Sequence, residues 1–168
     1  KAWDFHVKTA LGIKNEENLP ELILNNSDIE FQNVNFKYES TIEKAINNIS
    51  FKIEGGKITA LVGKSGSGKS TIINLIPRFY DPQNGKILFD AQNIKKVKLD
   101  SLRKNISLVS QDVVLFDDTI KNNILYANPT ASGEELLLAC NYAAADEFIE
   151  KLPNKYETMV GENGVKLS

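Results

Sequence analysis

Hydrophobic and polar positions alternate in two stretches after the first 27 residues. Residues 29–36 carry Ile, Phe, Val and Phe in a strand-like pattern that is broken once, which indicates a β-bulge. Residues 49–53 alternate regularly, with Ile, Phe and Ile separated by Ser and Lys. This alternation is typical of a strand with one buried face. We therefore predict two half-buried strands, the second ending in a turn at residues 54–56.

The next apolar run has no alternation. Residues 58–62 read Ile-Thr-Ala-Leu-Val, which suits a strand buried on both faces of a parallel α/β sheet. A glycine-rich stretch follows, and the apolar residues behind it recur at helical spacing: Ile72, Ile73, Ile76 and Phe79. Residues 87–89 and 106–109 read as further short strands. The order strand, glycine-rich loop, helix predicts an α/β core.

Beyond residue 116 the sequence pattern is typical of helices. Ser132 and Glu135 have the spacing of a helix capping box. The apolar run behind Glu135, and a second one at residues 148–152 before Pro153, predict two short helices. The first 27 residues are polar and irregular, and we interpret them as a linker with a short helix at residues 5–13.

The composition of the chain argues against several kinds of binding partner. Its 42% hydrophobic and 25% charged residues are ordinary for a globular protein, and the net charge of −2 gives no general attraction to nucleic acid or an anionic membrane. The single cysteine, Cys140, lies in an apolar run and is expected in the core, without a disulfide partner. The single histidine, His6, has no second metal ligand at helical spacing, so we predict no metal site there.

The glycine-rich stretch fits the spacing of a phosphate-binding loop, which is glycine, any four residues, glycine, lysine, and serine or threonine. The residues concerned are Gly63, Lys64, Ser65, Gly66, Ser67, Gly68, Lys69 and Ser70, with Thr71 next to them. Glycines permit positive φ and turn backbone N–H groups inward around phosphate oxygens. We expect Lys69 to reach the β- and γ-phosphates and the Ser70 hydroxyl to ligate Mg²⁺. Kinases, GTPases, helicases and transporters all use such a loop, so the loop leaves the class open.

Further motifs surround the loop in a fixed order: Phe36-Lys37-Tyr38, Arg78-Phe79-Tyr80-Asp81-Pro82, Val109-Ser110-Gln111-Asp112, the stretch 156–164, and Leu167-Ser168. From about Ile29 to the last residue this order resembles the nucleotide-binding domain of ATP-binding cassette (ABC) exporters of the multidrug and lipid type. The resemblance implies an α/β fold, in which a P-loop NTPase core carries an antiparallel β subdomain and the start of an α-helical subdomain. It divides the chain into a linker from a transmembrane domain (1–27), the core (28–112) and the helical subdomain (113–168).

The resemblance also implies roles for single residues. Tyr38 corresponds to the aromatic residue that stacks on adenine, and Ile46 is a further candidate for contact with the ring. Gln111 corresponds to the glutamine that contacts Mg²⁺ or the attacking water and senses the transmembrane domain, so Lys69 and Gln111 are the catalytic candidates in this chain. Glu162 would meet the intracellular loops of that domain, and Leu167-Ser168 would begin the signature motif.

ATP and Mg²⁺ are the implied cofactors. The implied partners are a transmembrane domain, in the same polypeptide or in another subunit, and a second ABC ATPase domain in a head-to-tail dimer. The parent protein is expected at the cytoplasmic face of the cell membrane, and this piece of it in solution. The acidic strand motif, the catalytic glutamate and the switch histidine lie further along in this family, so these 168 residues are expected to bind ATP without hydrolysing it.

Two other classes of ABC protein share part of this pattern. An ABC importer ATPase shares the phosphate loop, but the stretch 156–164 is similar to the exporter sequence. A soluble ABC ATPase of DNA repair or chromosome maintenance would carry long coiled coils, and the sequence contains no sustained heptads. One departure from the family pattern is Asp90-Ala91, where Asp-Gly is usual, and we expect a less permissive turn there.

Overall fold

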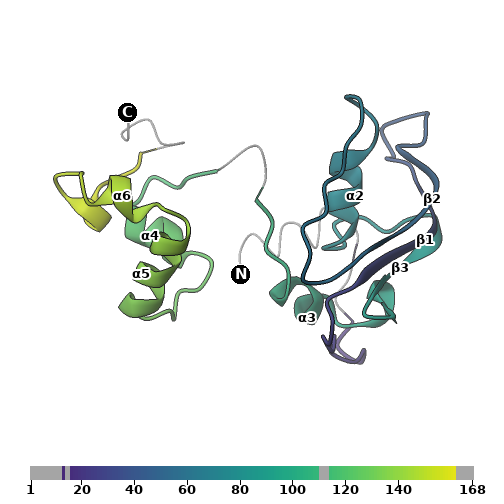
Figure 1. Ribbon diagram of the computed structural model, residues 1–168, viewed down its shortest axis with the longest axis horizontal. Coiled ribbons are helices and arrows are strands. Elements are labelled where there is room, and N and C mark those ends of the chain that lie inside the picture. The colour runs from purple at the N-terminus through teal and green to yellow at the C-terminus, as the bar shows by residue number, and fades with distance from the viewer. Residues whose placement is uncertain (1–12, 14–15, 110–113, 162–168) are drawn as a thin grey trace. The chain divides into compact units, whose positions relative to one another are not determined.

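The computed structural model describes residues 13, 16–109 and 114–161, which belong to two compact units, Lys1–Ser107 and Leu108–Ser168 (Figure 1). The elements of the first unit are β1 (Ile29–Phe36), β2 (Ile46–Ile53), α2 (Lys69–Leu75), β3 (Asn84–Phe89), β4 (Gln92–Asn93), the 3₁₀ helix η1 (Ile94–Lys96) and α3 (Leu99–Lys104). Those of the second are α4 (Ile120–Leu125), α5 (Gly133–Tyr142), α6 (Asp146–Ile149) and the 3₁₀ helix η2 (Lys155–Glu157).

The first unit contains a four-stranded antiparallel sheet in the order β2-β1-β3-β4. The register of β1 against β2 shifts between Phe31 and Val34. Asn33 has a φ of 50° there, and the extra residue lets Phe31 and Val34 both be buried although three positions separate them. The β-bulge predicted from the broken alternation is therefore confirmed.

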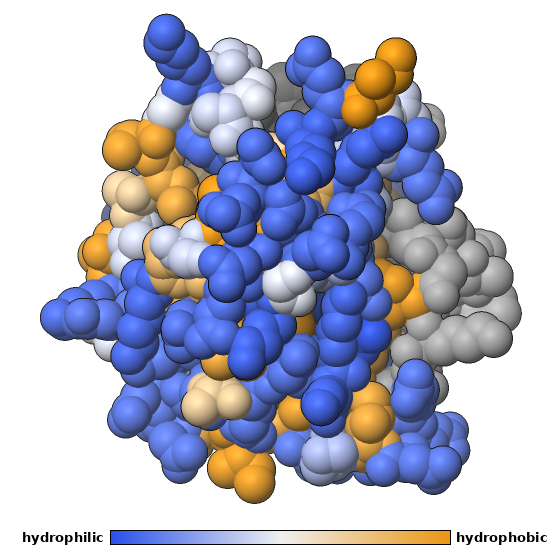
Figure 2. Space-filling model, turned by 90° about the vertical axis from the view of Figure 1, so that its right-hand side faces the viewer, coloured by the Kyte–Doolittle hydropathy of each residue, from blue (hydrophilic) through white to orange (hydrophobic). Residues whose placement is uncertain are grey.

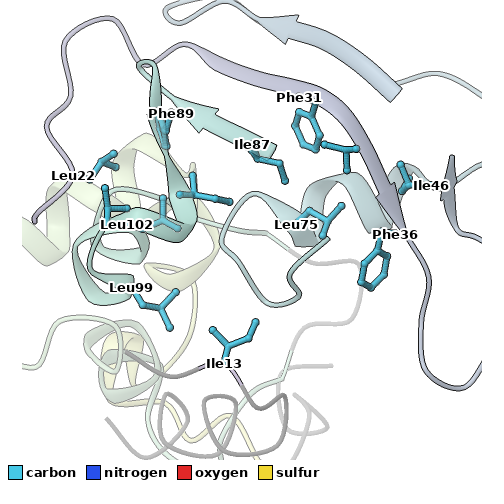
Figure 3. Packing of buried hydrophobic residues seen from close by; sticks show 13 residues of the cluster. Ile13, Leu22, Phe31, Phe36, Ile46, Leu75, Ile87, Phe89, Leu99 and Leu102 are labelled. Atoms are coloured by element: carbon cyan, nitrogen blue, oxygen red, sulfur yellow. The ribbon is translucent and has the colours of Figure 1, made fainter. Parts of the chain in front are cut away.

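The core of the first unit lies between the sheet and its helices. Leu75 of α2 projects into a cluster that includes Phe31, Phe36 and Ile87 of the sheet (Figure 3). Leu102 of α3 belongs to the same cluster. The side of the unit on which β1 and β2 lie in Figure 1 presents mainly hydrophilic residues (Figure 2). One face of the sheet is thus apolar and covered, as the alternation predicted.

The turn between β3 and β4 places Asp90 and Ala91 at φ values of 46° and 62°. Two consecutive positive φ angles are typical of a tight hairpin turn that favours Asn-Gly or Asp-Gly. Aspartate tolerates this conformation, whereas alanine pays roughly 1–2 kcal/mol for its Cβ. Ala91 therefore has a backbone conformation that favours glycine, and the less permissive turn expected there stays a prediction.

The Asp90 side chain holds the segment that enters β1. Its Oδ2 accepts hydrogen bonds from the backbone N–H groups of Asn25, Asn26 and Ser27 at 2.7, 3.1 and 3.0 Å. Its Oδ1 accepts a fourth bond, from the N–H of Asp28 at 2.8 Å. Partial burial alone would raise the pKa of Asp90, but these four donors stabilise the charged form and lower the pKa below its usual value. We call this arrangement the Asp90 clamp.

The structure contradicts the predicted strand at residues 58–62. This segment has no regular structure, and Ile58 and Val62 are almost fully exposed. The predicted strand at residues 106–109 is wrong in the same way. A parallel strand needs hydrogen-bonded neighbours and cover on both faces, and within the described part of the chain no strand pairs with either segment.

The second unit packs five buried residues together: Ile120, Leu136, Cys140, Ile149 and Val160. The capping box is confirmed, because the Ser132 N–H donates to the Glu135 carboxylate at 2.7 Å and the Glu135 N–H donates to the Ser132 hydroxyl at 3.2 Å. The predicted pair of short helices corresponds to α5 and α6. Cys140 is buried, as expected. The short helix predicted at residues 5–13 falls almost wholly outside the described residues.

Candidate functional site

The loop at residues 63–68 leads directly into α2, and its glycines have distinct reasons to be glycine. Gly66 and Gly68 lie in the left-handed region, at φ values of 77° and 88°. A Cβ on Gly68 would stand 2.6 Å from the carbonyl oxygen of Ala45 and 2.7 Å from the Cδ1 of Ile46. Around Gly66, no heavy atom of the described residues lies within 4 Å of the corresponding position. Gly68 is therefore packed against the strand side of the unit, and Gly66 faces open space.

The Lys69 ammonium lies inside the loop that precedes it. It donates to the backbone carbonyls of Gly63 and Lys64 at 2.9 and 2.8 Å, and to the Ser67 hydroxyl at 3.4 Å. The loop is further closed by a hydrogen bond from the Ser67 N–H to the Lys64 carbonyl at 3.2 Å. A cation at the centre of a loop that opens on the N-terminus of a helix is a suitable environment for phosphate oxygens.

The remaining loop residues differ in exposure. Lys64, Ser65, Ser67 and Ser70 are exposed, so the Ser70 hydroxyl can be reached by a hydrated cation. Thr71 is only 6% exposed. Its side chain is therefore buried, and its contact with a nucleotide stays a prediction.

Tyr38 lies beside this loop and is linked to it. Its hydroxyl is hydrogen-bonded to the Thr71 hydroxyl at an oxygen–oxygen distance of 3.1 Å. Its ring packs edge-on against Phe36 and Tyr80, with centroid distances of 4.7 and 5.1 Å and interplanar angles of 84° and 87°. The ring is partly exposed, so an aromatic ligand can reach it. The structure thus brings the predicted base-stacking residue and the predicted phosphate loop together.

Ile46, the other candidate for base contact, is only 3% exposed and lies in the core cluster. It lies next to Gly68, since a Cβ added to Gly68 would stand 2.7 Å from its Cδ1, and its contact with a base stays a prediction. Gln111, Glu162, Leu167 and Ser168 lie outside the described residues, so their assigned roles also stay predictions.

Residues 78–81, in the Arg-Phe-Tyr-Asp-Pro motif, hold Tyr80 in position. Arg78 has a φ of 55° and makes a bidentate ion pair with Asp81, through Nε at 2.9 Å and a terminal nitrogen at 3.1 Å. Arg103 of α3 donates to the carbonyls of Pro77 and Arg78, both at 3.0 Å. The loop after α2 is therefore fixed from two sides, which also fixes the Tyr80 ring against Tyr38.

Two contacts in the site could not be predicted from the sequence. Tyr80 packs against the Tyr38 ring, and the hydroxyl of Thr71, which stays a predicted nucleotide-binding residue, is bonded to the Tyr38 hydroxyl. Their contacts with Tyr38 join residues 33 or more positions apart, and local spacing carries no signal for such contacts. The Ala45 carbonyl beneath Gly68 is a backbone group, which no residue pattern could reveal.

Comparison with known proteins defines the class. Residues 46–168 match the ABC transporter family, so the chain belongs to that family, and the exporter resemblance noted above is confirmed. The structure superposes on that of a bacterial Atm1-family ABC exporter with ATP bound, with a TM-score of 0.86, 44% identity, and coverage of 93% of this chain and 27% of that one. No helix of the described residues is long and apolar enough to cross a membrane.

Individual relatives indicate which type of ABC protein the chain resembles. The chain is 54% identical over 142 residues to the ATP-dependent lipid A-core flippase of Haemophilus influenzae, covering 84% of this chain and 24% of the relative. It is 47% identical over 165 residues to a putative multidrug export ATP-binding/permease protein of Staphylococcus aureus, covering 98% of this chain and 28% of the relative. The chain thus spans about a quarter of the length of these relatives and is part of an ABC exporter nucleotide-binding domain.

Proposed function

We propose that this chain is the ATP-binding portion of an exporter ATPase domain. The observation that carries the proposal is the site geometry, in which a phosphate loop around Lys69 is linked by a 3.1 Å hydrogen bond to an aromatic residue that can stack on a base. Nucleotides present both features, phosphates and a flat base. Base–aromatic stacking contributes about 1–3 kcal/mol per base.

The residues present fit a bound nucleotide and its cation. The open space around Gly66 leaves room for phosphate oxygens at the loop backbone. Lys69 would exchange its bonds to loop carbonyls for bonds to the β- and γ-phosphates, and the exposed Ser70 hydroxyl would hold Mg²⁺ together with Gln111. Bound Mg²⁺ would neutralise phosphate charge, and the chain's own residues would orient the triphosphate.

For the whole protein, we propose ATP-driven export across a membrane, with a transmembrane domain and a second ABC ATPase domain as partners. The relatives' names, a lipid A-core flippase and a multidrug export ATP-binding/permease protein, support export over import. On this proposal the chain works at the cytoplasmic face of the membrane, where Glu162 and Gln111 contact the transmembrane domain.

We further propose that these 168 residues bind ATP without turnover. Hydrolysis needs a group that orients the attacking water and accepts its proton. The loop residues 63–71 supply glycines, hydroxyls and ammonium groups but no carboxylate. Gln111 is neutral, and its amide can orient a water but is a poor proton acceptor.

Titration calorimetry with Mg²⁺ and ATP tests the binding proposal. Lys69→Ala removes a charged hydrogen-bond donor and should weaken ATP binding by about 1.5–3 kcal/mol. Lys86→Ala removes the same charge from an exposed position on β3 and serves as the matched control, with affinity expected to stay at the wild-type value. Equal ATP affinity of the Lys69→Ala and wild-type chains would contradict the proposal. Phosphate release that depends on Lys69 would contradict the absence of turnover.

A further inference from the structure

The Tyr38 ring has a defined position although it lies at the edge of the unit. Phe36 and Tyr80 contact it edge-on, and these two rings are themselves 5.4 Å apart. The packing limits sideways movement of the ring, and the bond from its hydroxyl to Thr71 limits rotation of the side chain out of this position. Three contacts from three different segments of the chain thus define where a base could stack.

The partner of that hydroxyl belongs to the phosphate-binding element. Thr71 lies in the first turn of α2, directly after Ser70, and its side chain is buried. In the loop before α2, the Gly68 backbone lies so close to the Ala45 carbonyl and Ile46 that an added Cβ would clash with both. The segment that carries Tyr38 and the segment that carries the loop therefore touch at two points, a hydrogen bond and a close backbone contact.

From this arrangement we propose that Thr71 is a positioning residue for base recognition, acting through the Tyr38 hydroxyl. The inference rests on the proposed nucleotide binding and adds a second role to a residue of the predicted phosphate loop. A ring already fixed in its stacking position loses little conformational freedom when a base binds, so the full stacking free energy contributes to the affinity. Without the Thr71 hydroxyl, the entropic cost of ordering the ring offsets part of that free energy.

The test separates the base from the phosphates by comparing two ligands, ATP and inorganic triphosphate, each with Mg²⁺. The ratio of their affinities reports what the base contributes. Tyr38→Phe and Thr71→Val each remove one side of the hydrogen bond, and each should lower the ratio about threefold to tenfold, the range of one net hydrogen bond. Thr71→Ser keeps the hydroxyl and should retain the wild-type ratio, as should Tyr126→Phe, the same substitution in the second unit.

The double variant Tyr38→Phe with Thr71→Val makes the test specific. If the two hydroxyls act through each other, the double variant should lower the ratio no further than either single variant does. If Thr71 has only a structural role, Thr71→Val will weaken the binding of ATP and of triphosphate equally, and the affinity ratio will stay at the wild-type value. That result would overturn the inference. A double variant whose ratio falls by the product of the two single effects would overturn it as well. A wild-type chain that binds neither ligand would overturn the proposed function itself, whereas triphosphate binding with an insensitive ratio overturns only the role of Thr71.

Discussion

Gly66 and Gly68 have similar backbone angles but are constrained by different physics. At Gly66 the positive φ opposes a side chain at a cost of about 1–2 kcal/mol, and among the described residues no atom stands close to an added Cβ. At Gly68 the same cost is joined by contacts of 2.6 and 2.7 Å with Ala45 and Ile46. One of these is with a backbone oxygen, which cannot move without displacing the entrance to β2.

We therefore predict that Gly68→Ala lowers the free energy of unfolding by about 3 kcal/mol or more, whereas Gly66→Ala lowers it by about 1–2 kcal/mol. Urea unfolding of the two variants, followed by circular dichroism, measures the difference. The pair is a matched comparison because residue type, loop and sign of φ are the same. Equal destabilisation by the two substitutions would mean that the contact between Gly68 and the strand side has no energetic weight.

At the scale of elements, the predictions from sequence succeeded where the needed partners are local. The bulge in β1, the alternation of β2 and the capping box of α5 were predicted because each depends on residues a few positions apart. The strand predicted at residues 58–62 was wrong because a largely apolar run forms a strand only when neighbouring strands and helices cover it. Helix α3 was missed, although Leu99 and Leu102 at helical spacing, with Arg103 and Lys104 in the last turn, carried the signal.

The same distinction between local and long-range contacts applies to the site. The phosphate loop could be predicted because the chemistry of phosphate binding constrains consecutive residues. The position of Tyr38 beside that loop was predicted from the family resemblance. The hydrogen bond between Tyr38 and Thr71 could be predicted neither from the loop chemistry nor from the resemblance. That bond joins side chains 33 positions apart, and it exists only because the sheet and α2 pack as they do.

The Asp90 clamp makes a prediction for pH at the scale of the sheet and the segment before it. Because four N–H donors lower the pKa of the folded state, the clamp stabilises the fold above the ordinary aspartate pKa, near 4. That stability is lost as the pH falls below this value through the lowered pKa. Asp90→Asn should reduce the free energy of unfolding at pH 7 by about 1–2 kcal/mol, since the amide lacks the charge and presents its own donors.

Unfolding free energies of the wild type and Asp90→Asn, measured from pH 7 to pH 3, test this prediction. The wild-type stability should fall toward that of the variant as the pH is lowered, so the difference between them should shrink. Asp28 is a nearby acid whose pKa is also lowered, by its hydrogen bond with Lys52, and it will contribute a similar slope to both proteins. A difference that is constant with pH would show that the charge on Asp90 does not stabilise the segment.

For the molecule as a whole, the uncovered apolar segment has a predictable effect on behaviour in solution. Ile58 and Val62 are almost fully exposed, and a hollow of about 570 Å³ next to them is lined mainly by apolar residues, among them Ile53, Ile73 and Ile76. Exposed apolar surface of this kind promotes association. Sedimentation of the chain should therefore show a mass that rises with concentration.

Ile58→Lys should lower that association, because it places a charge on the uncovered segment. Ile42→Lys is the matched control, since Ile42 is also almost fully exposed but stands in the loop between β1 and β2 and does not line the hollow. The two variants carry the same net charge, so a difference between them reports position alone. Equal suppression by both would point to a general charge effect instead of this segment.

The geometry of the Asp90 clamp also has a mechanical consequence. Four consecutive N–H groups, from Asn25 to Asp28, are held by one carboxylate. A pull on the chain from its N-terminal side loads several of these bonds together, because all four end on the same carboxylate. Tension that reaches residue 25 is therefore transmitted to the β3–β4 turn, and through β3 to the centre of the sheet. The Asp90 clamp therefore allows the start of β1 to bear tension from the preceding part of the chain.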